Sequence, residues 1–373
     1  MYTKQKICRI VPIIAFLFLF VLPYKHLNAQ MICSGSACSA LPISNQQLDE
    51  VFSALRFQYF DEVLKDMSNA MVYSGMHISP SGVVNLREFT IGAALTASTT
   101  KARKLDVYVP SYGTLTDMPS AGISVVPKLF VGFNLGYLFS GEPYNWYVLD
   151  RFGLHRFDFY ISGLNLSLNE MQKYAKPKKD EQYGGFSKSI AAELRYHLVE
   201  GGDREAAFFS FSGVSLGLGY NRIEQKLSYT RSKSKVKLNA GSGTTIVWDG
   251  QDNILYHSKM DVVPVSIRTG IQFLYLLRLS VGGGVAFSKG SSELELSRFG
   301  RAYANNDLAA LLGLNLPDAY LSLALKGSGG PSSPRNAFAT VGLEINIPFV
   351  KLFVDAAGDQ KNYSANVGVR FVF

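Results

Sequence analysis

Apolar and polar residues alternate along most of the chain after position 86. From Phe89 to Ala97, apolar side chains occupy every second position, and Thr, Gly or Ala lies between them. Because successive side chains of a strand point to opposite faces, this two-residue period predicts β-strands with one apolar face. The pattern predicts strands near 87–98, 121–139, 152–168, 186–199, 207–229, 255–276, 279–297, 308–316, 319–327, 336–347, 350–357 and 362–373.

The second face of these strands is built of small residues. In one segment Leu216 and Leu218 alternate with Ser215, Gly217 and Gly219. A half-exposed soluble sheet also alternates, but its polar face meets bulk water. An apolar outer face with a small, polar inner face is typical of a transmembrane barrel. The predicted fold class is therefore all-β: a transmembrane antiparallel β-barrel of about 12 strands, with 10 to 14 strands open.

The last predicted strand, 362–373, ends on alternating aromatic residues, Phe371 and Phe373. It resembles the terminal strand of bacterial outer-membrane barrels. In that class a closing phenylalanine is read by the barrel-assembly machinery, so the resemblance implies that Phe371 and Phe373 form an assembly signal. Both termini of such barrels face the periplasm. This orientation predicts long outer loops at 99–120, 169–185, 231–254 and 298–307.

Residues 1–29 have the pattern of a secretory signal peptide: a basic start, an apolar run from Ile10 to Leu22, and Ala29 at the expected cut. A membrane anchor would need about 20 apolar residues. Residues 1–29 hold four Lys or Arg and no acidic residue, so their removal lowers the formal net charge from +8 to +4. This charge does not suggest a nucleic-acid partner. The predicted location is the cell outer membrane.

Residues 44–73 follow a helical period instead of alternating. Apolar residues recur at three- and four-residue steps from Leu48 to Met71, which predicts one amphipathic helix, or two helices broken near Gln58. A helix cannot belong to the barrel wall, so residues 30–85 are expected to plug the lumen or to lie below it, and residues 86–373 to form the barrel. This layout resembles the fatty-acid-channel class of outer-membrane transporters, which carry an N-terminal hatch.

Cys33 and Cys38 remain after signal removal. In an exported chain we expect them to form a disulfide, and lipidation of Cys33 stays open. The run CSGSACSALP from Cys33 to Pro42, with the following helix and barrel, resembles a group of leptospiral surface-adhesin proteins. That resemblance implies binding to host matrix components.

Two sets of charged residues are candidates for function. Those expected to face the lumen are Lys128, Glu193, Arg195, His197, Arg268, Lys326, Glu344 and Arg370. They would line a mixed-charge lumen or brace the plug. Those expected in outer loops, as possible sites for sulfated glycans or lipopolysaccharide phosphates, are Lys173, Lys176, Lys178, Lys179, Arg231, Lys233, Lys235 and Lys237. Solvated loops are the alternative interpretation of this second set.

The sequence indicates no catalytic set, metal site or cofactor. Gly213 to Gly217 matches G-x-S-x-G, but that motif needs a strand-to-helix turn, and here it lies within a predicted strand. We therefore expect a protein that is not an enzyme. Its first expected function is a channel or passive transporter for small or hydrophobic solutes. The alternative is a surface adhesin that uses its outer loops to bind host matrix proteins or glycans.

Overall fold

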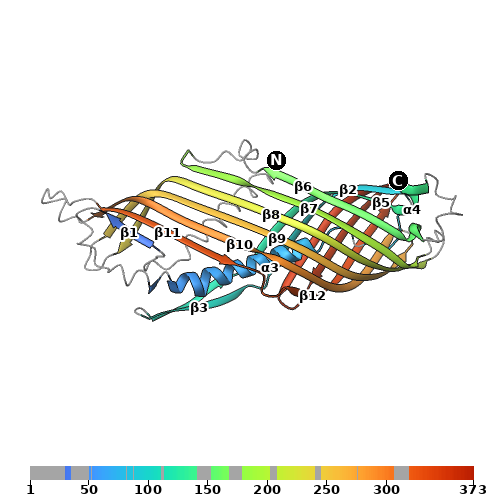
Figure 1. Ribbon diagram of the computed structural model, residues 1–373, viewed down its shortest axis with the longest axis horizontal. Coiled ribbons are helices and arrows are strands. Elements are labelled where there is room, and N and C mark those ends of the chain that lie inside the picture. Colours follow the sequence, from blue (N-terminus) through green and yellow to red (C-terminus); the bar gives the residue numbers. More distant parts are fainter. Residues whose placement is uncertain are drawn as a thin grey trace.

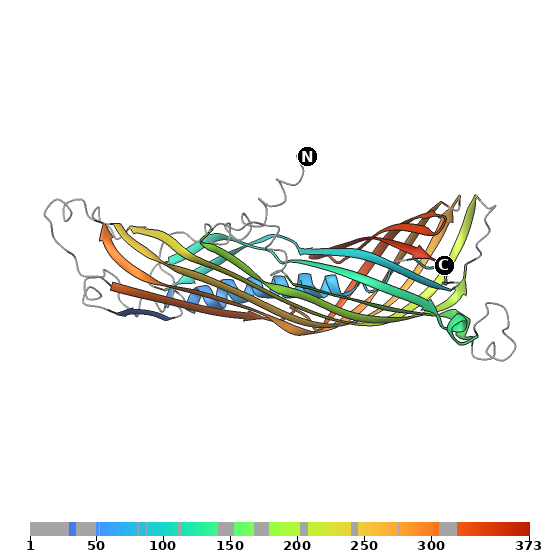
Figure 2. The ribbon, with the colours of Figure 1, turned by 90° about the horizontal axis from the view of Figure 1, so that it is seen from above.

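A computed structural model shows an elongated molecule made mostly of long strands (Figures 1 and 2). It describes residues 30–34, 50–51, 53–80, 82–86, 88–110, 113–140, 153–167, 179–201, 208–239, 245–274, 276–305 and 319–373. The predicted signal peptide lies outside these residues. Within them, no helix has the length and apolar character needed to cross a membrane.

Ten antiparallel strands form a closed ring. In ring order they are β2 (Phe89–Thr100), β5 (Ile123–Asn134), β6 (Phe157–Ser167), β7 (Glu181–Glu200), β8 (Phe209–Asn239), β9 (Thr245–Phe273), β10 (Leu277–Asn305), β12 (Arg335–Ile347), β13 (Val350–Gly358) and β14 (Asn362–Val372). Pairing of β14 with β2 and of β9 with β10 closes the ring. The predicted fold class, an antiparallel β-barrel with a helical plug, is confirmed.

Two further strands bring the sheet to twelve without entering the ring. The first half of β10 pairs with β12, whereas its second half pairs with β11 (Ala319–Gly329). The short strand β1 (Gln30–Ser34) then pairs with β11. The sequence places 319–327 in the barrel wall, and that placement is wrong because β11 continues the sheet beyond the ring. The predicted strand 308–316 lies outside the described residues.

The strands β8, β9 and β10 are far longer than the others, with 31, 29 and 29 residues. They reach well past the ring toward β1 and β11 (Figure 1). The predicted loops at 231–254 and 298–307 are therefore mostly strand. A hairpin of β3 (Arg103–Val109) and β4 (Gly113–Ser120) replaces most of the loop predicted at 99–120.

At the other end of the ring the β9–β10 and β12–β13 turns are short, and we call this the short-turn end. Main-chain hydrogen bonds join Leu274 to Phe208, Val372 to Phe349 and Phe373 to Phe89 there. The helices α4 (Leu135–Ser140) and η4 (Leu154–Arg156) lie in the connection between β5 and β6 at this end. We call the opposite part of the molecule the head: residues 50–67, β1, β3, β4, β11 and the parts 224–239, 245–257 and 291–305 of β8, β9 and β10.

The ring carries a band of exposed apolar side chains on its outside. Each ring strand contributes alternate residues, and these side chains are mostly 40–55% exposed, among them Ile91, Leu95, Leu129, Val131, Ile161, Ile190, Leu216, Leu218, Ile267, Val281, Val341, Val354 and Val367. The shorter ring strands, β2, β5, β6, β12, β13 and β14, have 9 to 13 residues, which matches the length needed to cross a bilayer at a tilt. We call this band of exposed side chains the apolar band.

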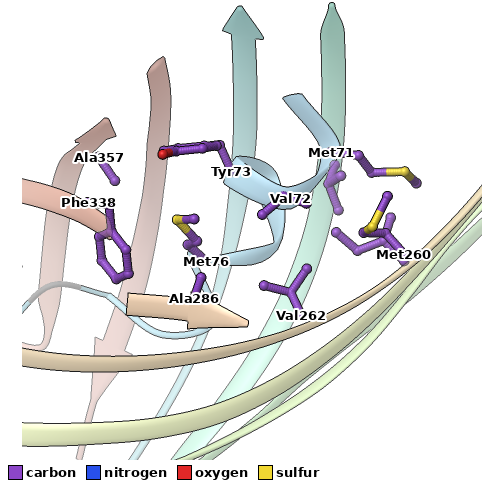
Figure 3. Packing of buried hydrophobic residues seen from close by; sticks show 11 residues of the cluster. Met71, Val72, Tyr73, Met76, Met260, Val262, Ala286, Phe338 and Ala357 are labelled. Atoms are coloured by element: carbon purple, nitrogen blue, oxygen red, sulfur yellow. The ribbon is translucent and has the colours of Figure 1, made fainter. Parts of the chain in front are cut away.

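One helix runs from the head into the ring. Residues 50–51 and 53–55 are helical, η2 (Arg56–Phe60) is a single π turn, and α3 (Asp61–Gly75) follows without a break. The π turn lies where the sequence suggests a break near Gln58. The last turns of α3 are enclosed: Met71, Val72, Tyr73 and Met76 pack against apolar side chains of β5, β8, β9, β10, β12 and β13 (Figure 3).

Candidate functional site

The interior of the ring is filled by the helix and by the chain that follows it. After α3, residues 76–86 run through the ring to the start of β2, and we call them the plug segment. Met76, Ile78, Val83 and Leu86 of this segment are all buried. A backbone inside a barrel has to find hydrogen-bond partners, because unpaired buried polar groups are costly. The inner faces of the strands supply those partners.

Three cations on three different strands donate to main-chain oxygens of the plug segment. Lys128 on β5 donates to His77, and Arg195 on β7 donates to Gly82 and Pro80. Arg268 on β9 also donates to the Pro80 oxygen, at 3.3 Å. The three side chains are 1–7% exposed. These residues therefore brace the plug segment instead of lining an open aqueous lumen.

The charge of Arg195 is balanced on its own strand. Glu193 lies two residues away on the same inner face, with its Oε1 3.2 Å from Nη2 of Arg195. Arg195 also donates to the Ser79 hydroxyl, and its guanidinium lies over the ring of Tyr160 at 5.3 Å. A buried arginine is stable only when its charge and donors are matched, and this one is matched on all sides.

A second charged cluster lies nearer the short-turn end. Glu344 on β12 accepts from Arg278 at 2.7 Å and from Arg370, and Arg278 also donates to Gln272 at 2.6 Å. The plug segment touches this cluster at Gly82: a Cβ there would lie 2.9 Å from Nη2 of Arg370. The absence of a side chain at Gly82 therefore lets the backbone approach the ion pair.

His197 belongs to a third group, around Asp158. The Asp158 carboxylate lies 2.8 Å from Nε2 of His197, and it also accepts from the main-chain N–H of Leu86 at 3.1 Å. Ser215 lies opposite His197 across the β7–β8 pair. The three side chains are 0–1% exposed. Their burial and the bond to Leu86 indicate a structural role in holding the end of the plug segment.

Of the eight residues that the sequence places in the lumen, seven point inward and are buried. Lys326 does not. It lies on the outer face of β11, its side chain is 64% exposed, and it pairs with Glu293 at 3.6 Å. The sequence prediction fails because β11 belongs to the head, where the apolar face of the strand covers the helix and the polar face meets solvent.

The head has its own apolar core between the hairpin and the sheet. Val51, Leu55, Tyr59 and Val63 of the helix pack against a set made of Val107, Val109, Met118 and Leu325. The side-chain amide of Gln58 bonds both the N–H and the C=O of Tyr108, at 2.9 and 3.0 Å. The π turn thus presents Gln58 as a partner for the edge of β3.

Ion pairs fix the other end of the hairpin. Arg103 on β3 contacts Glu62 at 2.9 Å and Asp66 at 3.1 Å. Hydrogen bonds to Arg103 and Lys65 hold the pKa of Glu62 below its usual value. At the link before β5, the Asp66 main-chain oxygen would lie 1.9 Å from a Cβ at Gly122. Hairpin, helix and ring are therefore held together at this point.

The basic residues predicted in loops are only partly placed. Lys173, Lys176 and Lys178 lie outside the described residues, and Lys179 is exposed just before β7. The row of four at 231–237 lies in strand β8, and its members do not share one face. A bulge between Arg231 and Ser234 shifts the register. Arg231 therefore lies opposite the buried Asp252, whereas Lys233, Lys235 and Lys237 are exposed.

The remaining predicted residues lie at opposite ends of the molecule. Cys33 lies in β1 beside the head, and Cys38 lies outside the described residues, so the disulfide stays a prediction. Phe371 and Phe373 lie at the short-turn end, where the ring of Phe373 stacks on that of Phe89 with centroids 4.5 Å apart. Within the described part of the chain, no group of three or more His, Cys, Asp or Glu could hold a metal ion.

Sequence reasoning misses several residues of these clusters. Asp158 and Arg278 are inward charges that it does not single out. It also overlooks Arg298, whose guanidinium lies 4.8 Å from the Trp248 ring and pairs with Asp252 inside the head. The hairpin has a signal that could have revealed it, because Leu105, Val107 and Val109 alternate within the predicted loop.

The family comparison supports the resemblance to leptospiral surface adhesins noted in the sequence. A protein-family profile described as Lsa36-like, for a leptospiral surface adhesin, matches residues 26–373. The chain belongs to the Lsa36-like family. A search of curated proteins finds no match for this Lsa36-like chain.

Solved structures similar to this Lsa36-like protein are barrels of low sequence identity. The outer membrane protease OmpT of Escherichia coli is 10% identical, with 77% of this chain and 97% of that chain covered and a TM-score of 0.35. A Pseudomonas aeruginosa FadL homologue is 9% identical, covering 83% and 98%, with a TM-score of 0.26. Ail of Yersinia pestis, in complex with a heparin analogue, is 6% identical, covering 77% and 99%, with a TM-score of 0.23. None of these likenesses carries a function to this chain.

Proposed function

We propose that this protein is a surface-exposed adhesin of the outer membrane, in which the barrel is an anchor and the head is the binding part. The observation that carries the proposal is the filled ring. The helix end, the plug segment and three braced cations occupy the interior, and their buried side chains named above are 0–7% exposed. A permanently filled barrel supports a scaffold better than it supports a solute channel.

The location rests on three features taken together. The apolar band has the height of a bilayer core, the predicted signal peptide directs export, and the family is one of leptospiral surface adhesins. The short β9–β10 and β12–β13 turns lie at the end that holds Phe373. In the orientation usual for such barrels this end faces the periplasm, and the head then faces outward.

The proposed ligands are host matrix proteins or their glycans, bound without chemical conversion. The outer face of the head carries Lys233, Lys235 and Lys237, and among the described residues Lys235 pairs with Asp249 at 3.4 Å. Exposed charges act over about 8 Å at physiological salt, so binding through these lysines should weaken as salt rises. The variant in which these three lysines are replaced by serine, the three-serine variant, should lose most of that salt dependence while the ring stays folded.

Two measurements test the proposal. Single-channel recording on the refolded protein should show no steady conductance, and a persistent ohmic conductance would support a channel. Intact cells that carry the protein should bind purified matrix proteins and heparin, and this binding should be saturable. If shaving the head with protease leaves cell binding unchanged, the head is not the binding part. Lys326→Ser, an exposed lysine paired with Glu293, is the matched control for the three-serine variant.

A further inference from the structure

Seven exposed cations follow the head-side edge of the apolar band. Four lie on the outer face of neighbouring strands, one begins β12, and two lie at the ends of β2 and the β13–β14 turn. We call this set the cationic belt: Lys101, Lys188, Arg222, Lys259, Lys289, Arg335 and Lys361. The two turn residues are adjacent, because the Lys101 main-chain N–H donates to the Lys361 oxygen.

Strand register places four members of the belt at two neighbouring levels, one pleat apart. Lys188 lies opposite Glu224 on β8, and Glu224 lies opposite Lys259 on β9. One pleat away, Arg222 lies opposite Asp261, and Asp261 lies opposite Lys289 on β10. Neighbouring strands are about 4.8 Å apart, so the four cations lie on four adjacent strands in two staggered rows, with Glu224 in one row and Asp261 in the other.

The belt begins where the apolar band stops. On the outer face, an apolar residue lies two positions from each cation, on the side of the apolar band: Ile190 beside Lys188, Tyr220 beside Arg222, and Phe287 beside Lys289. Two residues of a strand span about 7 Å, so apolar surface changes to cationic surface over that distance. The Tyr220 hydroxyl donates to Asp261 at 2.6 Å, which marks the same boundary with an amphipathic ring.

Positive charge at this level is only partly neutralised. The acidic residues that face these cations across the strand pairs are Glu224, which lies 3.2 Å from His257, and Asp261, which lies 3.9 Å from Arg222. Within the described residues, Lys188, Lys259 and Lys289 form no ion pair. Three unpaired ammonium groups therefore face outward immediately above an apolar surface.

We propose that the cationic belt binds phosphate groups of lipid headgroups while the acyl chains lie on the apolar band. The occupant is a phosphorylated glycolipid of the outer leaflet. Charge complementarity favours it, as does continuity with the lipid-facing band, since one molecule can occupy both surfaces. The short-turn end differs: aromatic rings such as Phe89, Phe373, Phe208 and Phe273 gather there. The proposal rests on the outer-membrane location but not on adhesion.

The test is a titration of the refolded protein, in neutral detergent, with lipid A as a phosphorylated glycolipid. The double variant Lys259→Gln, Lys289→Gln removes two unpaired belt cations. Each cation near an anionic lipid surface contributes about a five-fold change in affinity, so the variant should bind lipid A roughly 25-fold more weakly. The matched control is Lys233→Gln, Lys237→Gln, which removes the same charge from the head and should bind lipid A like the wild type.

Three outcomes would overturn the proposal. The control could weaken lipid A binding as much as the belt variant, which would indicate net charge alone. Wild-type protein could bind dephosphorylated lipid A equally well, which would exclude the phosphate contact. Inorganic pyrophosphate could bind as tightly as lipid A with the same dependence on Lys259 and Lys289, which would show an adventitious anion site. Matrix binding should also be measured on both variants, and the belt variant should retain it. A failure of the adhesin proposal can therefore be distinguished from a failure of the lipid-binding proposal.

Discussion

Arg195 offers the sharpest test of how the ring is kept filled. Its side chain donates to Ser79, Pro80 and Gly82 of the plug segment and balances Glu193, and it is 1% exposed. We consider Arg195→Gln, which removes the charge and shortens the side chain. The change leaves Glu193 buried with its nearest cation gone, while the main-chain ladder of β7 stays intact.

The magnitude follows from the contacts. A hydrogen bond to a charged group contributes about 1.5–3 kcal/mol, and three such bonds to the plug segment are lost together. Removing one partner of a buried ion pair costs about 3–5 kcal/mol. These terms overlap, so we expect a total of about 3–5 kcal/mol. If that cost falls on the plug segment, its local opening becomes roughly a hundred- to several-thousand-fold more frequent.

Two assays report the opening. Hydrogen exchange of residues 77–86 should accelerate in the variant, and brief conductance steps should appear in planar bilayers. Arg301→Gln, on the exposed face of β10, is the control and should change neither signal. If exchange of the plug segment in Arg195→Gln matches the wild type, then the braced cations do not hold the plug, and this account of the interior is refuted.

Three further predictions concern the head and the seam. In Gly122→Ala, the new Cβ would meet the Asp66 main-chain oxygen; overpacking of about 1–3 kcal/mol should loosen the hairpin and speed its proteolysis, and unchanged cleavage would contradict this. The lowered pKa of Glu62 means that its contribution to hairpin docking is complete above its ordinary value of 4.5 and is lost as pH falls through the lowered pKa. Acid should therefore accelerate exchange in β3–β4, and Glu62→Gln should remove that pH dependence. Deletion of Phe373 should reduce the heat-modifiable folded protein in outer membranes, whereas Phe211→Ala should not; equal amounts would argue against an assembly role.

The barrel could be predicted from the sequence because its cause is local. Each strand alternates with a period of two, and this period alone determines which face meets the lipid. The helix was equally visible from its three- and four-residue steps. Inward charges such as Arg195 and Glu344 could be predicted in the same way. Once the apolar face of a strand is assigned to the outside, the residues between must point inward.

The head could not be predicted in this way, because its strands lose the apolar outer face. Beyond Arg222, Lys259 and Lys289 both faces of β8, β9 and β10 carry polar residues, so the pattern resembles a solvated loop. A bulge after Arg231 then shifts the register, and no local signal marks it. The pairing of β10 with two different strands also depends on tertiary structure and is not encoded within β10 itself. The contacts of the plug segment depend on residues far apart in sequence, such as Arg195 and Gly82, and no single stretch encodes them.

The seam between β14 and β2 has a consequence for the order of biogenesis. It joins the last strand of the ring to the strand that directly follows the plug segment, with eleven matched positions from Asn362 to Val372. Once β14 pairs with β2, the ring surrounds the end of α3 and the plug segment, and they can no longer leave sideways between two strands. The plug segment must therefore be in place, with its polar contacts to Arg195, Arg268 and Lys128, before the ring closes. Pairing of the last strand is then the step that encloses an interior which has already assembled.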